Sequence, residues 1–508
     1  MKSQNLLFST AILAGVNILI KILGFIYRII LVRLIGAEGL GLFELISPIT
    51  MLIFTIVGSG VPIAIIRLIT QALANNKEYE SFKIIEYASF IMFFISLILS
   101  IVLFLGAPFI ANNILGDERL LIPLYIFAPA ILLPSLAAIL RGYFYGKKNV
   151  IPPALSQLLE QITRIVIVLA LLSILYPFGE ENAIIISMVA VVLSELAGLL
   201  LLMSFFRIAR KNIFINSKTK KNHFMGTMKN FSNIAFPITL SRVVNSLLRV
   251  ATSIIIPGRL MVSGLNNSTA LSKFGEVNGM VMPLLFLPFT LTSALVMNLI
   301  PRISEAIEKR SFHILNIYAD KAFHLVFFIG LPLSGIFYIY SNEIFSILYA
   351  SPGGIYLAQL SIATLFLCIY QVSASILQGI GKQVISTIVY ILGMSIQLIL
   401  NYILVALPEY QITGYIISYL FSTIIISLVN FILVLHYAKV RIHYKKWILL
   451  PGLATCIALL SSRLFLSRLL LDFSMNFSFL ITILVFGITY FALLLVSGNF
   501  KSLFSKLK

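Results

Sequence analysis

Long apolar runs alternate with short polar gaps along almost the whole chain. A helix needs about 20 apolar residues to cross the hydrocarbon core of a bilayer, so each run of that length predicts a membrane-spanning helix. The predicted spans are 8–33, 41–66, 84–109, 120–141, 152–176, 183–206, 232–256, 275–300, 322–341, 355–378, 384–407, 412–437, 447–466 and 477–497. The pattern therefore predicts an all-α integral membrane protein with fourteen transmembrane helices.

The composition agrees with a membrane protein. Of the 508 residues, 60% are hydrophobic and only 11% are charged, whereas about 25% are charged in a typical soluble domain. The formal net charge of +19 would suggest nucleic-acid binding in a soluble protein, but here most basic residues lie in the gaps between apolar runs. We therefore expect the chain to contact the lipid bilayer and no nucleic acid.

Basic residues in alternate gaps predict the orientation, because cytoplasmic loops of membrane proteins carry an excess of lysine and arginine. The gaps on the basic side hold Lys2, Arg67, Lys77, Lys83, Arg141, Lys147, Lys148, seven residues between 207 and 229, Arg302, Lys309, Arg310, Lys321, Lys382, Lys439, Arg441, Lys445, Lys446, Lys501, Lys506 and Lys508. The other gaps hold Arg33, Arg119, Arg259, Lys273, Arg463 and Arg468, together with the acidic pairs Asp117-Glu118 and Glu180-Glu181. Both termini are therefore predicted to be cytoplasmic.

A weak internal repeat divides the chain into halves. The segment RGYFYGKKNVIPPALSQ (141–157) corresponds to LQGIGKQVISTIVYILG (377–393), and LFEL (42–45) corresponds to FGEV (274–277) at nearly the same separation. Because each half has six predicted helices, both halves enter the membrane from the same side, as parallel repeats around a central cavity. The predicted parts are an N-terminal six-helix lobe (1–206), a basic cytoplasmic linker (207–230), a C-terminal six-helix lobe (231–437), and helices 13 and 14 with a cytoplasmic tail (438–508).

Two predicted helices carry paired cations inside the membrane. Lys21 and Arg28 are seven residues apart, so they lie on one helix face with Asn17 and Gly24. The first helix of the second half repeats the pattern with Arg242, Asn245 and Arg249. A cation inside a membrane normally faces a water-filled cavity or a partner, and these side chains suit the oxygens of phosphate or pyrophosphate. We predict that both stripes bind an anionic substrate headgroup.

Acidic residues leave a structural alternative open. The cations could extend to the membrane interface, or pair with the membrane acids Glu44, Glu160, Glu195 and Glu276 as structural ion pairs. Glu44 and Glu276 occupy matching places in the two halves, and could orient the arginines or bind a driving cation.

A second polar group lies on the predicted fifth helix. Gln157, Glu160, Gln161 and Arg164 share one face through their three- and four-residue spacing, and Glu160 could pair with Arg164 within the helix. These residues are secondary candidates for the substrate site.

The sequence shows no pattern typical of a metal site, a cofactor site or a catalytic domain. The two cysteines lie in apolar runs and the five histidines lack ligand spacing. No gap is long enough for an ATPase or another soluble catalytic domain. We expect no cofactor and no enzymatic activity; Na⁺, H⁺ or the membrane potential could drive transport.

Four segments carry a family resemblance: ILGFIYRIILVRLIGAEGLGLFEL (22–45), RGYFYGKKNVIPPALSQLLEQITR (141–164), FGEVNGMVMPLLFLP (274–288) and LQGIGK (377–382). With the fourteen-helix plan, the chain resembles the polysaccharide exporters of the multidrug/oligosaccharidyl-lipid/polysaccharide flippase superfamily, within it the stage V sporulation protein B group. The resemblance implies a V-shaped two-lobed fold in the cytoplasmic membrane of a bacterium, and export of undecaprenyl-linked saccharides. In the related lipid II flippases cationic residues of helix 1 surround a central cavity; here that role falls on Lys21 and Arg28.

The leading interpretation is a flippase for a lipid-linked oligosaccharide, plausibly the peptidoglycan precursor lipid II, which functions as a monomer by alternating access. A role in sporulation, vegetative wall growth or capsule export stays open. The main alternative is a cation-coupled multidrug exporter of the same superfamily, which would favour an acidic cavity. A membrane glycosyltransferase would show clustered aspartates, but Asp117, Asp320 and Asp472 are isolated. A scaffold without transport activity gives no reason for paired cation stripes.

Overall fold

A computed structural model describes residues 2–75, 78–175, 180–211, 224–351, 353–440, 442–469 and 474–498, and the regular structure in these residues is helical. The chain forms two compact units. Unit 1 comprises Met1–Gly258 and Asn266–Gly275, and unit 2 comprises Arg259–Leu265 and Glu276–Lys508. The repeat predicts that the second lobe begins at 231, whereas the contacts of unit 1 continue to Gly258. The predicted division into lobes stays a prediction.

The described residues contain eleven helical segments long and apolar enough to cross a membrane, or twelve if the bent pair Glu118–Ala130 and Leu132–Gly146 is one span. Three features account for the difference from the predicted fourteen. The segment Gly15–Ala74 contains two predicted spans, the bent pair corresponds to the predicted span 120–141, and the predicted span 275–300 is divided among three shorter helical elements. The all-helical membrane class is confirmed, and the number fourteen stays a prediction.

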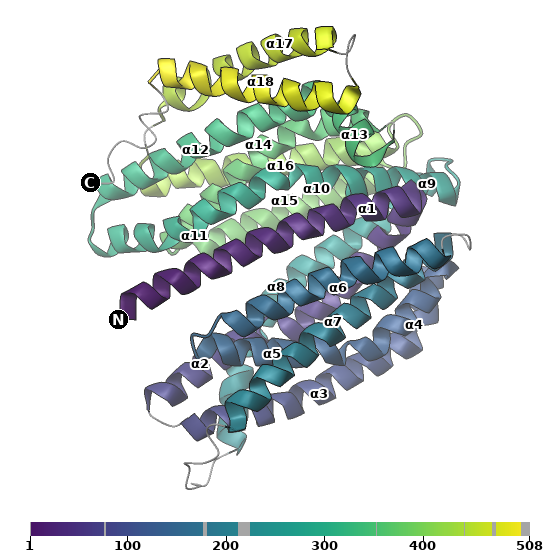
Figure 1. The fold of residues 1–508 in the computed structure, drawn as a ribbon, viewed down its shortest axis with the longest axis vertical. Coiled ribbons are helices and arrows are strands. Elements are labelled where there is room, and N and C mark those ends of the chain that lie inside the picture. Colours follow the sequence, from purple (N-terminus) through teal and green to yellow (C-terminus); the bar gives the residue numbers. More distant parts are fainter. Residues whose placement is uncertain are drawn as a thin grey trace. The chain divides into compact units, whose positions relative to one another are not determined.

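Unit 1 is a bundle of helices that run side by side (Figure 1). Its elements are α1 (Lys2–Gly58), α2 (Val61–Ala74), α3 (Glu78–Phe109), η1 (Ile110–Leu115), η2 (Glu118–Leu120), α4 (Leu121–Ala130), α5 (Leu132–Gly146), α6 (Ile151–Leu175), α7 (Glu180–Lys211), α8 (Phe224–Val262) up to Gly258, and α9 (Asn267–Phe274).

Gly36 divides α1 into two arms. Its backbone has φ 70° and ψ −173°, a conformation that residues with a Cβ atom rarely adopt. Arm 1 therefore ends before Gly36 and arm 2 begins after it, as the two separate predicted spans 8–33 and 41–66 require.

Close backbone contacts hold α9 against arm 2. A Cβ atom at Gly41 would overlap the carbonyl of Leu271, and one at Gly275 would overlap the carbonyl of Ala37. Small residues allow membrane helices to approach in this way, because packing rather than the hydrophobic effect drives their association.

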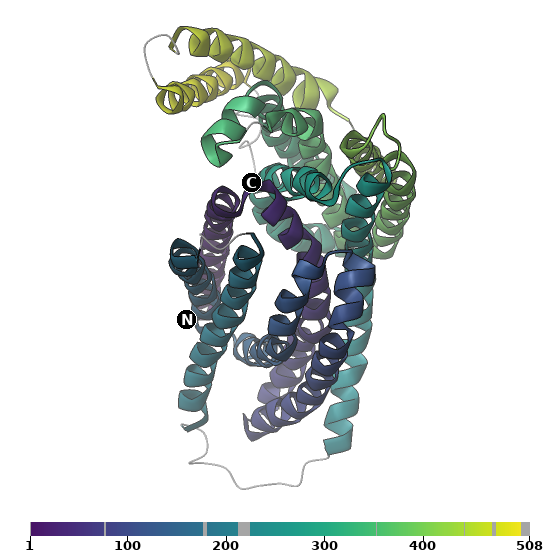
Figure 2. The same cartoon turned by 90° about the vertical axis from the view of Figure 1, so that its right-hand side faces the viewer.

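Unit 2 contains η5 (Gly275–Val281) from Glu276 on, α10 (Met282–Leu285), α11 (Leu287–Glu308), α12 (Phe312–Ile339), α13 (Ser341–Tyr349), α14 (Gly354–Gly379), α15 (Gln383–Leu404), α16 (Ile412–Ala438), η6 (Lys445–Leu449), α17 (Leu450–Leu469) and α18 (Met475–Val496). Helices α17 and α18, drawn in yellow, lie side by side, and α17 packs on α12 (Figures 1 and 2).

One acidic side chain fastens η6 to α12. Trp447 is fully buried and packs on the rings of Phe323 and Phe327. The indole Nε1 of Trp447 donates to Asp320 Oδ1 over 2.9 Å, and Lys446 Nζ donates to Asp320 Oδ2 over 3.0 Å. His443 Nδ1 lies 2.9 Å from Asp320 Oδ1. Asp320 is thus the shared acceptor that holds η6, and with it the start of α17, on α12.

We predict that Asp320→Ala destabilises this attachment, because the buried indole loses its acceptor and Lys446 loses its counter-ion. The cost is about 1–3 kcal/mol, typical of hydrogen bonds that involve a charged group. Thermal unfolding in detergent would show a lower Tm, with earlier proteolysis between α16 and α17. Glu308→Ala, at an exposed residue, is the control, and equal Tm values for the two variants would contradict the prediction.

Candidate functional site

The predicted stripe on arm 1 faces both arm 2 and α6. Arg28 Nη2 forms an ion pair with Glu44 Oε1 on arm 2, and the two side chains are 20% and 15% exposed. The turn at Gly36 makes this contact possible, since it folds residues sixteen apart in sequence against each other. The pairing of a helix 1 cation with a membrane acid, which the sequence leaves open as a structural alternative, therefore forms in the structure.

Gly24, in the middle of the stripe, lies close to α6. A Cβ atom at Gly24 would be 3.7 Å from Gln161 Nε2 on α6. One turn further along, Arg164 of α6 is close enough for its charge to act on the Tyr27 hydroxyl of arm 1. The stripe thus approaches the polar face of α6 at Gly24, whereas Lys21 is exposed and Asn17 is half-buried.

The secondary candidates on α6 pair differently from the predicted arrangement. Glu160 does not pair with Arg164 but with Arg141 of α5, and Ser156 Oγ lies 2.9 Å from Glu160 Oε1. Arg141 was expected in a cytoplasmic loop, but α5 continues to Gly146 and presents Arg141 to α6. The reason is geometric: Arg141 approaches the Glu160 carboxylate from a neighbouring helix, so Glu160 needs no partner on its own helix.

Helix α7 approaches Glu160 closely at Gly198. A Cβ atom at Gly198 would overlap the Glu160 carboxylate, and Ser156 Oγ lies 3.2 Å from the carbonyl oxygen of Gly198. Glycine at this position therefore leaves room for the ion pair between α5 and α6.

Arg164 turns toward α7. Its Nε donates to Ser194 Oγ over 3.3 Å, and its Nη2 lies 3.8 Å from Glu195 Oε1. Gln157 lies at one end of the same α6 face. Its Nε2 donates to the Tyr145 hydroxyl over 3.4 Å and to the Pro153 carbonyl oxygen over 3.2 Å.

The predicted stripe on α8 is more exposed. Arg242 and Arg249 are exposed and Asn245 is half-buried. Arg242 Nη1 donates to the carbonyl oxygen of Ser59 over 3.4 Å, and Ser246 Oγ lies 3.4 Å from Thr55 Oγ1. Helix α8 therefore contacts the end of arm 2. Glu276, the remaining candidate, lies in η5 of unit 2, where its charge acts on Tyr356.

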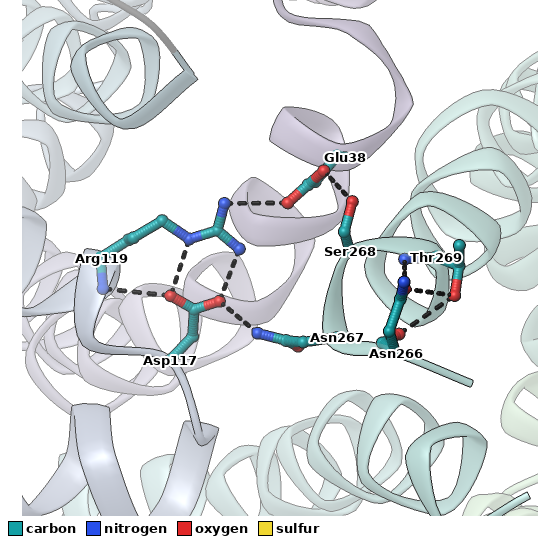
Figure 3. Close-up of polar contacts among 7 residues, drawn as sticks. All are labelled: Glu38, Asp117, Arg119, Asn266, Asn267, Ser268 and Thr269. Atoms are coloured by element: carbon teal, nitrogen blue, oxygen red, sulfur yellow. Dashed lines mark hydrogen bonds and ion pairs between the residues drawn. The ribbon is translucent and has the colours of Figure 1, made fainter. Parts of the chain in front are cut away.

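A polar cluster, the Glu38 cluster, joins three distant segments of unit 1 (Figure 3). Arg119 Nη2 and Nε donate to the two oxygens of Asp117 over 2.7 and 2.9 Å, and Arg119 Nη1 donates to Glu38 Oε1 over 2.9 Å. From the start of α9, Asn267 Nδ2 donates to Asp117 Oδ2 over 3.0 Å and Ser268 Oγ donates to Glu38 Oε2. The loop pattern predicts that this end of unit 1 is extracytoplasmic.

Asp117 lies between two candidate membrane segments, and its hydrogen-bonding neighbours favour the ionised form of its carboxyl group. Burial tends to raise the pKa of this carboxyl, but the hydrogen bonds and charge of Arg119, with the Asn267 amide, outweigh burial and hold the pKa below its usual value. The carboxylate is therefore ionised wherever the cluster is intact.

The family comparisons agree with this fold. A family model described as "Polysaccharide biosynthesis protein" matches residues 6–307. The chain belongs to this family. A second model, MatE, matches residues 237–403, and the chain is thus a membrane transporter of the multidrug/oligosaccharidyl-lipid/polysaccharide flippase superfamily and not an enzyme.

Curated relatives of this polysaccharide biosynthesis protein include two from Bacillus subtilis. Stage V sporulation protein B is 29% identical over 88% of this chain and 87% of its own length. The lipid II flippase MurJ is 23% identical over 84% of this chain and 83% of its own length.

Solved structures show the same fold. An inward closed conformation of the lipid II flippase MurJ has a TM-score of 0.71 at 18% identity, over 96% of this chain and 98% of that chain. An inward-facing multidrug resistance MATE family transporter has a TM-score of 0.65 at 15% identity, over 84% and 98% of the two chains.

Metal ligands do not gather in the described residues: they contain no group of three or more His, Cys, Asp or Glu side chains that could hold a metal ion.

The spacing along single helices does not indicate Arg141 or Glu38 as members of these clusters, and it does not distinguish Glu195 from the other membrane acids. Their partners are far away in sequence, and helical spacing reports only neighbours on one helix. An acidic residue near the centre of an apolar run, as at Glu195, was the one available signal.

We predict that the Glu38 cluster makes stability depend on pH. Because the pKa of Asp117 is lowered by folding, its contribution is present above the unfolded value of about 3.9 and disappears as pH falls through the lower folded value. Asp117→Asn should therefore have a lower Tm than the intact protein at pH 7, and the difference should shrink between pH 5 and 3. A difference in Tm that is constant over this range would contradict the assignment.

We also predict that Gly198→Ala displaces Glu160 and separates the Arg141 ion pair, with a loss of about 1–3 kcal/mol typical of overpacking. Gly258→Ala is the matched control, because a Cβ atom at Gly258 would meet no heavy atom within 4 Å. Thermal unfolding would compare both variants. A Gly198→Ala protein as stable as Gly258→Ala would contradict the close approach.

Proposed function

We propose that the chain is a flippase that moves an undecaprenyl-pyrophosphate-linked saccharide, with lipid II as the first candidate, across the cytoplasmic membrane. The observation that supports it most is the stripe of arm 1, which carries Lys21 and Arg28 and approaches the amide- and arginine-bearing face of α6 at Gly24. The similarity to stage V sporulation protein B and to the lipid II flippase MurJ supports the same substrate class.

The chemistry of this face suits an anion with several oxygens. Lysine provides a compact charge and arginine provides a planar donor fork, and both bind phosphate oxygens strongly when water is partly excluded. Arg28 is only 20% exposed, and Glu44 holds its guanidinium in place. The saccharide and pyrophosphate would bind on this polar face while the polyprenyl chain stays in lipid.

The proposal includes the architecture that the sequence predicts: fourteen spans, two parallel six-helix lobes around a central cavity, both termini in the cytoplasm, and alternating access by a monomer in a bacterial membrane. Arg28 is less exposed than Arg242 and Arg249, which supports it as the first candidate headgroup ligand, and Lys21 is an exposed candidate on the same stripe. Arg242, Arg249 and Asn245 are proposed as further ligands, with Glu276 as an orienting or ion-coupling residue.

The alternative is a cation-coupled multidrug exporter. The MatE match over 237–403 favours it, as does the shared fold of a multidrug transporter. Such exporters bind mostly cationic compounds, which the positive face of arm 1 would repel. Binding of a cationic dye in place of a prenyl pyrophosphate would favour the alternative.

We predict that Lys21→Ala/Arg28→Ala abolishes lipid II movement. The assay is protection of fluorescent lipid II from an external quencher in proteoliposomes, with and without a sodium gradient, a pH gradient or a membrane potential. The loss of two charge-assisted contacts, each about 1.5–3 kcal/mol, predicts a reduction of more than about a hundredfold in rate. Lys309→Ala, an exposed basic residue, should move lipid II normally.

Folding is controlled separately, because Arg28→Ala leaves Glu44 without its partner. Arg28→Ala/Glu44→Gln removes both charges of the pair, and should restore the Tm but not the transport. Full recovery of transport in this variant would assign Arg28 a structural role. No movement by the intact protein under any gradient would eliminate lipid II as the substrate.

A further inference from the structure

Glu195 is a carboxylate near the middle of an apolar segment with an incomplete set of partners. It lies in the candidate span Asn182–Arg210 and is 8% exposed. Among the described residues no donor forms a hydrogen bond with Oε2 of Glu195, which is buried. The other oxygen, Oε1, lies 3.8 Å from Arg164 Nη2, which is beyond hydrogen-bond distance.

The neighbouring carboxylate Glu160 is in the opposite situation. It is equally buried, at 8% exposure, but it forms an ion pair with Arg141 and accepts a hydrogen bond from Ser156. The negative charge of Glu160 acts on Glu195 and disfavours a second charge beside it. Of the two acids, Glu160 therefore has close partners for its carboxylate, and Glu195 is the one with a buried oxygen that accepts no hydrogen bond from the described residues.

Four elements pack on α7, namely α6, α5, α4 and α1. The charged groups that act on Glu195 are Glu160 and Arg164 of α6 and Arg141 of α5. Arm 1 of α1 carries Tyr27 and Arg28, and the charges of Arg164 and Arg28 act on the Tyr27 hydroxyl. From α4 the titratable side chain is Tyr125, whose ring packs on Phe104. Two arginines and two carboxylates face each other in the α5–α7 group, so this group is neutral with both acids ionised and carries one positive charge when Glu195 is protonated.

Arg164 is the residue that would lose its counter-ion if Glu195 took up a proton. Among the described residues its guanidinium makes one hydrogen bond, from Nε to Ser194, and the side chain is 24% exposed. Arg164 also lies on the α6 face that adjoins the arm 1 stripe. The nitrogens Nη1 and Nη2 can therefore either stay with an ionised Glu195 or donate to an anion at that face.

We propose that Glu195 binds an exchangeable proton, and that its protonation frees Arg164 to bind the anionic part of the substrate. The step is a proton transfer from a hydronium ion of the aqueous phase to the Glu195 carboxylate, which leaves a water molecule and changes no other covalent bond. Proton and headgroup would bind together, so the affinity for the anion would rise as pH falls. This inference rests on the proposed function for the identity of the anion, but the proton site itself does not.

The first measurement tests the proton alone. Infrared difference spectra of the purified full chain in nanodiscs, between pH 5 and 9, should show a carboxylic-acid C=O band that titrates. The band should be lost in Glu195→Gln and kept in Glu409→Gln, which alters an exposed glutamate. If no band titrates, or if it persists in Glu195→Gln, the proposal is wrong.

The second measurement tests the link to Arg164, with geranylgeranyl pyrophosphate as the probe in calorimetry at pH 5.5, 6.5 and 7.5. The intact protein should bind the probe about tenfold more tightly at the lowest pH and take up a proton. Glu195→Gln should bind tightly at every pH without proton uptake beyond that of the probe itself. Equal pH responses in both proteins would overturn the link.

Further variants distinguish failure of the proton site from failure of the proposed substrate class. Arg164→Ala should weaken probe binding but keep the titrating band, whereas a purely structural role predicts loss of both together with the Tm. If Glu195→Gln does not fold, Glu195→Asp should keep a band at a shifted position. A titrating band in an intact protein that binds no pyrophosphate would uphold the proton site and contradict the proposed substrate class.

Discussion

The free-energy cost of placing charge in hydrocarbon is the constraint on which the polar structure of this transporter depends. An unpaired ion in a bilayer core is expensive, so each membrane arginine and glutamate must find a partner, reach water or lose its charge. The described part of unit 1 shows these solutions in one bundle. Arg28 is paired with Glu44, Arg141 is paired with Glu160, and Glu195 has a longer ion pair with Arg164, at 3.8 Å.

Backbone geometry decides which partners are within reach. The turn at Gly36 folds arm 2 against arm 1 and brings Glu44 to Arg28. Gly198 lets α7 approach α6 where Glu160 needs room, and Gly41 and Gly275 let α9 lie directly on arm 2. Because α9 is held there, Asn267 and Ser268 reach Asp117 and Glu38. A few glycines thus determine where the ion pairs form.

The two kinds of arginine in unit 1 would bind an anion under different conditions. Paired arginines are held in position and lose little entropy when they bind a phosphate group. An arginine whose counter-ion can be neutralised is available only when a proton is bound, which makes its affinity for an anion dependent on pH. Arg28 and Arg164 represent these two cases on adjoining helices of unit 1.

The sequence by itself determined the membrane class, most of the helices, the transporter family and the paired spacing of Lys21 with Arg28. These features follow from local apolar length and helical period, which are properties of one segment at a time. The sequence did not determine that 275–300 is interrupted, that Glu160 pairs with Arg141 rather than Arg164, or that Glu38 meets Asp117, Arg119 and Ser268. Only the tertiary structure decided these contacts, because each joins residues on different helices, and their distance depends on how the helices pack rather than on the spacing within any one of them.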